Sequence, residues 1–198
     1  MLQSTRRSFI KLLPAVALIL AGAWWLLGRS EGATSIASQA PASTTTSAAF
    51  DFPITWNGDQ PSIIDQYAYR LKIDGDVANP LELTLEELNT MTTAQKTLLI
   101  HCVEGWDATV PWEGIPLSHL VQQAGPLPGV SRVTITATTG YSVALSSSEV
   151  ENADNMIALR VGGAVLTVDH GYPARLVVPS RPGEDWVKYV TRITCSSG

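Results

Sequence analysis

Residues 98–106 read LLIHCVEGW, and this stretch decides how the rest of the chain is interpreted. Its apolar start is too short for a helix, so Lys96 to Cys102 is predicted to be a strand buried on both faces. Cys102 falls where this strand ends and a polar loop begins. A thiolate fixed at such a boundary is a suitable ligand for a soft metal ion. A cysteine that simply fills space in the core is the alternative, and the residue alone leaves both interpretations open.

The N-terminus predicts export from the cytoplasm. Residues 5–11 read TRRSFIK, and the paired Arg6 and Arg7 stand just ahead of an apolar run, which is typical of a twin-arginine signal. An ordinary secretory leader that carries two arginines is the alternative. The twin-arginine route carries proteins that are already folded, typically around a cofactor. We therefore expect a periplasmic protein that contains a cofactor.

Changes in composition divide the chain into three parts. Residues 1–29 form the signal, and the apolar residues 12–28 within it are just long enough for a possible inner-membrane anchor if they are not removed. Residues 30–49 are almost all small or polar and predict a flexible linker. Residues 50–198 have the size and composition of one globular domain. The net charge of −5, without a basic run in the domain, argues against nucleic acid as a partner.

The domain is expected to be α+β and rich in short strands. Alternating or continuous apolar patterns predict further strands at residues 69–74, 133–137, 141–145 and 175–178. Capping boxes and a glycine stop predict short helices near residues 84–87, 116–125 and 146–149. The glycine pair at 162–163 predicts a hairpin.

Two motifs resemble those of the sulfite oxidase family of molybdopterin enzymes. HCVEGW and the following VPWEGIPL, residues 101–106 and 110–117, resemble the family's molybdenum-ligating segment. DHGYPARLVVP and WVKYVTRI, residues 169–179 and 186–193, resemble the segment that holds the cofactor. The resemblance implies a strand-rich, mixed-sheet molybdopterin-binding domain. It is expected to be a single domain without the family's C-terminal dimerisation domain.

The resemblance also implies the site. Its cofactor would be molybdenum–molybdopterin with one pterin per molybdenum, and Cys102 would be the metal ligand and a catalytic residue. Tyr141 would be the second catalytic residue, donating a hydrogen bond to the exchangeable oxygen of the metal, unless it is an ordinary packing residue. The resemblance further places five residues on the cofactor beside Cys102: Asn57, His101, His170, Arg175 and Lys188. For the charged residues and histidines among them, a structural role is the alternative.

Departures from the family restrict the substrate. A sulfite pocket needs arginines, whereas Glu104 follows the cysteine closely and Asp185 stands where an arginine would. The Cys-Val-Glu-x-Trp form resembles the periplasmic reductase branch, whose best-understood members reduce methionine sulfoxide in proteins. We therefore expect two-electron oxygen-atom transfer that reduces a small or protein-bound S- or N-oxide. The alternatives are a sulfite-type dehydrogenase and a non-catalytic exported binding module closed by a Cys102–Cys195 disulfide.

Electrons must be exchanged with another protein. The sequence has no Cys-x-x-Cys-His motif for attaching a haem. The expected partner is a membrane haem protein or a soluble cytochrome.

Overall fold

The computed structural model describes residues 50–54 and 64–198. The predicted signal, the predicted linker and Asn57 lie outside the described residues. None of the helices in the described ranges has the length and apolar character that crossing a bilayer requires.

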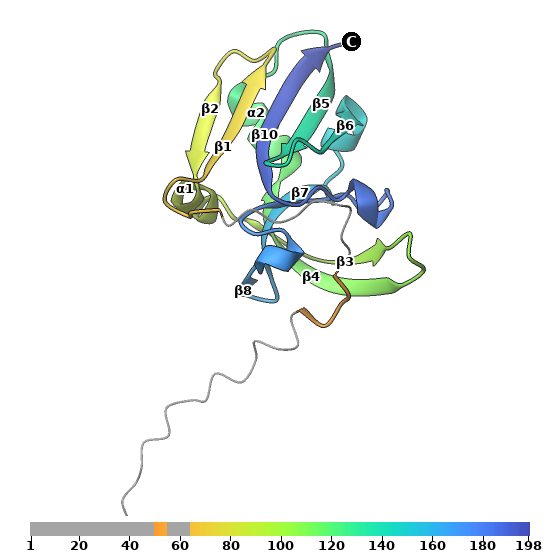
Figure 1. Ribbon diagram of the computed structural model, residues 1–198. Coiled ribbons are helices and arrows are strands. Elements are labelled where there is room, and N and C mark those ends of the chain that lie inside the picture. The colour runs from red at the N-terminus through yellow and green to blue at the C-terminus, as the bar shows by residue number, and fades with distance from the viewer. Residues whose placement is uncertain (1–49, 55–63) are drawn as a thin grey trace, which may run out of the picture. The chain divides into compact units, whose positions relative to one another are not determined.

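Five strands form the first sheet, in the order β2-β1-β10-β5-β6 (Figure 1). Their bounds are β1 Arg70–Gly75, β2 Leu81–Thr84, β5 Val130–Ala137, β6 Ser142–Ser146 and β10 Val190–Ser197. β10 runs parallel to β1, with Ile73 opposite Ile193, and all the other neighbours are antiparallel. The sheet is mixed because the last strand of the chain inserts between β1 and β5, which confirms the mixed-sheet expectation.

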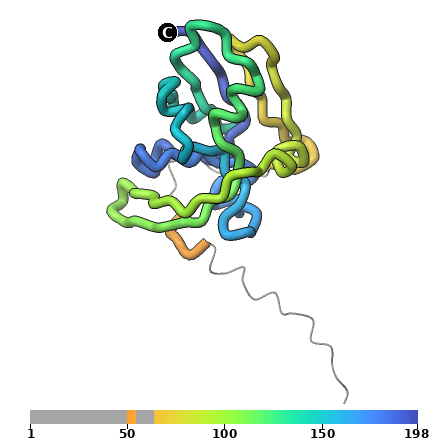
Figure 2. The backbone as a smooth tube through the Cα atoms, turned by 180° about the vertical axis from the view of Figure 1, so that it is seen from behind, coloured from red at the N-terminus to blue at the C-terminus, as the bar shows by residue number. Residues whose placement is uncertain are grey.

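The second sheet is antiparallel, in the order β3-β4-β7-β8, and β9 also pairs with β7. Its strands are β3 Ala94–His101, β4 Asp107–Pro116, β7 Met156–Val161, β8 Ala164–Val165 and β9 Arg175–Val177. Gly162 and Gly163 both have positive φ, 55° and 82°, which makes the tight β7–β8 turn that the glycine pair predicts. Figure 2 shows the β3–β4 hairpin as a long yellow-green arm.

Short helices connect the strands. They are α1 Leu85–Thr90, α2 Leu117–Ala124 and α3 Ser147–Val150, with single 3₁₀ turns η2 Val168–His170 and η3 Gly183–Asp185. Both predicted capping boxes are confirmed, with Thr84 and Ser146 as N-caps of α1 and α3. The predicted end of α2 is confirmed as well, because Gly125 takes the left-handed conformation there.

Apolar side chains gather in two clusters. One lies against the first sheet and includes Leu71, Ile135 and Ile193. The other belongs to the second sheet and is built around Trp112 and Trp186, both nearly inaccessible to solvent. The second cluster supports the candidate site.

One strand prediction is wrong in its burial. β3 is the outer strand of the second sheet in the described part of the chain, and only one face of it packs inward. Leu99, which the continuous apolar run placed inside, is 40% exposed, while its neighbour Ile100 is buried. Strands buried on both faces and edge strands share the same short apolar run, so sequence alone did not separate them.

Candidate active site

Cys102 follows β3 directly and is held by a tight turn. Its N–H donates to the Trp106 carbonyl at 2.9 Å, and the Gly105 N–H donates to the Cys102 carbonyl at 3.0 Å. Gly105 has φ 87°, which only glycine adopts without strain. The turn therefore fixes the position of a partly exposed thiol at the end of a strand, as predicted.

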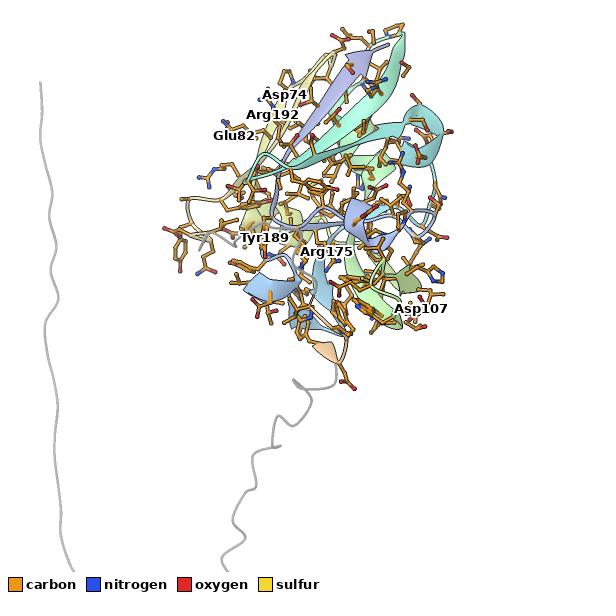
Figure 3. All side chains as sticks on the ribbon, turned by 45° about the vertical axis from the view of Figure 1, so that its right-hand side comes forward. Asp74, Glu82, Asp107, Arg175, Tyr189 and Arg192 are labelled. Atoms are coloured by element: carbon orange, nitrogen blue, oxygen red, sulfur yellow. The ribbon has the colours of Figure 1, made fainter. Side chains whose placement is uncertain are left out.

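Arg175 lies at the start of β9 and is only 4% exposed (Figure 3). Its guanidinium carbon is 5.3 Å from the ring centre of Trp112 and 6.0 Å from that of Trp186. Burial lowers the pKa of Arg175 to about 10, partly opposed by attraction to Tyr189 and Cys102. At neutral pH the arginine is thus a buried cation between two indoles.

Three buried donors around this corner lack a hydrogen-bond partner among the described residues. They are Arg175 Nε, Trp106 Nε1 and Trp112 Nε1. Buried polar groups in folded proteins are nearly always satisfied, because each unsatisfied one costs about 1–3 kcal/mol. The cluster is therefore suited to a polar ligand that supplies acceptors.

His170 is 5% exposed and has protein contacts at both ring nitrogens. Nδ1 lies 2.7 Å from the Thr167 hydroxyl, and Nε2 lies 3.5 Å from the Phe52 carbonyl. Phe50 and Phe52 pack on the ring, with centroids 4.9 and 4.5 Å away. Burial lowers the pKa of His170, so the imidazole is neutral at pH 7. These contacts fit the structural alternative, and a cofactor contact by His170 remains a prediction.

Segment 169–171 packs closely against two of the predicted cofactor residues. Lys188 Nζ donates to the Asp169 carbonyl at 2.8 Å, and Arg175 Nη1 donates to the His170 carbonyl at 3.2 Å. Gly171 has φ 105°, and a Cβ placed on it would lie 3.2 Å from the Cβ atoms of both Arg175 and Lys188. The structure therefore brings His170, Arg175 and Lys188 together at Gly171, where the backbone lies close to the side chains of Arg175 and Lys188.

Tyr141 is linked to the Cys102 region through η3. Its hydroxyl donates to the Glu184 carbonyl at 3.1 Å. A Cβ placed on the preceding Gly183 would lie 3.1 Å from the carbonyl oxygen of His101. One short segment thus contacts both Tyr141 and the residue before Cys102.

His101 lies on the other face of the hairpin. It is exposed, and its Nδ1 is 2.8 Å from an Asp107 carboxylate oxygen across the β3–β4 pair. The structure does not bring it together with Arg175 and Lys188. Its role on the cofactor stays a prediction, as does that of Asn57 outside the described residues.

The two cysteines are in different sheets. Cys195 is buried in β10 of the first sheet, Cys102 follows β3 of the second, and neither forms a disulfide. The disulfide alternative is therefore wrong. Within residues 50–54 and 64–198, no group of three His, Cys, Asp or Glu side chains could hold a metal ion.

Sequence reasoning missed the aromatic surroundings of the site. Trp112 and Trp186 enclose Arg175, and the sequence motifs did not predict this contact. Phe50 and Phe52 were not singled out as site residues, although their position at the very start of the predicted domain was the available signal. Aromatic residues are common in any core, so their partners follow only from tertiary structure.

A partly exposed thiol, a buried arginine and unsatisfied donors on a strand-rich scaffold form an arrangement suited to an anionic cofactor. Residues 57–198 match the family described as the oxidoreductase molybdopterin binding domain. The chain belongs to this family of enzymes.

Relatives support the assignment. The chain is 31% identical to the protein-methionine-sulfoxide reductase catalytic subunit MsrP of Gluconobacter oxydans over 143 residues, 63% of this chain and 46% of that protein. It is 28% identical to the uncharacterized oxidoreductase YuiH of Bacillus subtilis over 129 residues, 65% of each chain. The crystal structure of the sulfane dehydrogenase SoxCD from Paracoccus pantotrophus superposes with a TM-score of 0.65 at 28% identity, covering 70% of this chain and 40% of that one. The chain spans about half the length of the first curated relatives it matches.

The residues present fit the molybdopterin cofactor that the family implies. The cofactor carries a phosphate and a polar pterin, which need donors, and the site offers Arg175 with an unsatisfied Nε beside two unsatisfied indole N–H groups. Its metal needs a soft ligand, and Cys102 presents a thiol at the same corner.

Proposed function

We propose that this protein is a molybdenum-dependent enzyme that reduces an S- or N-oxide, such as methionine sulfoxide, by two-electron oxygen-atom transfer. The observation that carries the proposal is the buried Arg175, whose Nε lacks an acceptor among the described residues, together with the partly exposed Cys102 thiol at the end of β3. Such a buried cation is expected to need an anionic partner.

Each residue has a distinct part in the proposed site. When bound, the molybdenum cofactor, with one pterin per molybdenum, supplies the two-electron oxygen-atom exchange. Cys102 ligates the metal, and Arg175 and Lys188 hold the polar part of the cofactor. Trp112 and Trp186 exclude water from the guanidinium, which strengthens its electrostatic interactions.

Tyr141 is the proton donor in this proposal. Its phenol now donates to the Glu184 carbonyl at 3.1 Å. This hydroxyl holds a proton that can be donated to an oxygen atom of the substrate instead.

The charge near the hairpin favours a neutral oxide over sulfite. The turn of residues 102–106, which holds Cys102, carries Glu104 and no basic residue. Asp185 pairs with Arg181 at 3.3 Å, so its carboxylate offsets the positive charge of that arginine. A sulfite dianion would be repelled by such carboxylates. The relative named methionine-sulfoxide reductase agrees with this preference.

A sulfite-type dehydrogenase is the second candidate. Likeness to SoxCD, a sulfane dehydrogenase, favours it, because that protein acts on sulfur in the opposite redox direction.

Metal content and turnover test the proposal together. The protein is purified from a host that makes molybdopterin, beside Cys102→Ser and the matched control Cys195→Ser. We expect about one molybdenum per chain in the parent and the control, and its loss or inactivation in Cys102→Ser. A metal-loaded parent that oxidises sulfite but reduces no S- or N-oxide would establish the second candidate instead.

Export and an electron partner belong to the same proposal. We propose twin-arginine export to the periplasm, retention of residues 12–28 as an anchor, and electron supply by a membrane haem protein or a soluble cytochrome. The relative MsrP is named a catalytic subunit, which supports a separate partner. Changing Arg6 and Arg7 to lysine should leave the folded protein in the cytoplasm, and unchanged export would contradict the twin-arginine route.

A further inference from the structure

Arg181, between β9 and η3, binds three other groups with one side chain. Its Nε lies 2.7 Å from a Glu149 carboxylate oxygen at α3. Its Nη1 lies 3.3 Å from an Asp185 carboxylate oxygen in η3, and its Nη2 donates to the Ala144 carbonyl of β6 at 3.1 Å. Arg181 thus ties its own segment to the β6–α3 corner.

These contacts are stronger than those of an ordinary surface pair. The side chains of Arg181 and Glu149 are only 26% and 27% exposed. Glu149 is itself fixed, because its carboxylate accepts from the N–H and the hydroxyl of Ser146 in the α3 capping box. A partly buried, charge-assisted network of this kind holds one geometry, whereas exposed pairs contribute little.

The segment that Arg181 anchors contacts the candidate site at two places. The Glu184 carbonyl accepts from the Tyr141 hydroxyl. Trp186, whose Nε1 donates to the Arg181 carbonyl at 3.2 Å, lies against the Arg175 guanidinium. Among the described residues, the Arg181 side chain contacts Glu149, Asp185 and the Ala144 carbonyl, none of which is proposed to hold the cofactor.

We propose that Arg181 is a positioning residue for the active site. It fixes residues 181–186 against the β6–α3 corner, which holds the Glu184 carbonyl at Tyr141 and the Trp186 indole over Arg175. Its effect on turnover rests on the proposed function, while its effect on the segment does not.

Hydrogen exchange on the full-length protein tests the positioning role. The variants are Arg181→Gln, Arg181→Lys and the matched control Arg192→Gln, whose arginine pairs with Asp74 at 2.7 Å on the first sheet (Figure 3). We expect amide exchange in residues 181–186 to rise about tenfold in Arg181→Gln and less in Arg181→Lys, and to stay unchanged in Arg192→Gln. Unchanged exchange in Arg181→Gln would overturn the proposal. A rise throughout the domain would also overturn it, because the role would then be general stability.

A double-mutant cycle with Tyr141→Phe tests the path to the site. Arg181→Gln should lower kcat about fivefold in the parent and by much less in the Tyr141→Phe background, with KM nearly constant. Equal losses in both backgrounds would show that Arg181 does not act through Tyr141. If the metal-loaded parent turns over no substrate, the proposed function fails, while the exchange result still decides the positioning role.

Discussion

Arg175 carries its charge in a buried position, which has an electrostatic cost. Burial opposes its charge and lowers its pKa to about 10; its Nη1 donates to the His170 carbonyl, while its Nε has no acceptor among the described residues. Two indole faces offset part of this cost. Folding alone gains little from a cation in this position, so its value is expected to lie in binding an anion.

Arg175→Met therefore separates folding from binding. Without cofactor, the free energy of unfolding should change by less than about 1 kcal/mol, because a hydrophobic side chain of similar length replaces a buried charge. Molybdopterin retained after purification should fall at least about tenfold. Urea denaturation of the cofactor-free protein and pterin analysis measure the two effects. A loss of more than about 3 kcal/mol would instead show that Arg175 stabilises the fold.

Gly171 and Gly140 have similar positive φ angles, so a comparison of the two separates the cost of steric crowding from the cost of backbone strain. Gly171→Ala adds a Cβ 3.2 Å from Arg175 and Lys188 at φ 105°, whereas Gly140→Ala adds one at φ 92° with nothing within 4 Å. The left-handed backbone should lower the free energy of unfolding of both variants by about 1–2 kcal/mol. Gly171→Ala should cost about 1–2 kcal/mol more, because neighbouring atoms must move. If urea denaturation shows equal losses of unfolding free energy in the two variants, the atoms around residues 169–171 can move at little cost.

At the scale of elements, Glu149 of α3 takes part both in the capping box of that helix and in the hydrogen bonds of Arg181. The hydrogen bond from Arg181 is the main cause that lowers the pKa of Glu149 to about 2. The resulting stability is present above the ordinary pKa of about 4.5 and is lost as the pH falls through 2. Between pH 5 and pH 2 the free energy of unfolding of the parent should thus fall by about 1–2 kcal/mol more than that of Glu149→Gln, after allowing for solvent screening. Equal pH slopes in the two proteins would contradict this, and Glu151→Gln, at the neighbouring exposed carboxylate, is the control.

Local patterns in the sequence predicted most elements, and tertiary pairing decided the rest. The Ser146–Glu149 box and the Gly162–Gly163 turn depend on residues within a few positions, so both were predicted correctly. The burial of β3 was not, because it depends on β4 and β7 lying on one side of the strand only. In the site, the resemblance predicted that Cys102 and Arg175 both contact the cofactor, but it did not predict the indoles around Arg175, which come from β4 and from the segment after η3.

At the scale of the whole domain, the site draws on distant parts of the chain. Cys102 follows the hairpin of the second sheet, Tyr141 comes from the β5–β6 turn of the first, and Arg175 starts β9. Residues 50–52 also contribute, because Phe50 and Phe52 cover His170. The start of the described chain is therefore part of the site's support, although it lies outside every strand.

Two truncations test this dependence. A chain that begins at residue 42 keeps every described residue, and it should unfold like the full chain. A chain that begins at residue 55 lacks Phe50 and Phe52, and it should lose about 3 kcal/mol because the packing on His170 and Trp112 disappears.

The pKa of His170 gives a second measure of the packing that Phe50 and Phe52 provide. Burial holds the pKa of His170 below 6.5, so protonation opposes folding, and stability falls as the pH drops below 6.5. In the chain that begins at residue 55 the pKa should return toward 6.5 and this loss should shrink, whereas in the chain that begins at residue 42 both should stay as in the parent. NMR titration of His170 and urea denaturation at pH 5 and 8 measure the two effects. A low pKa that survives the shorter chain would mean that segment 167–175, and not the two phenylalanines, buries the imidazole.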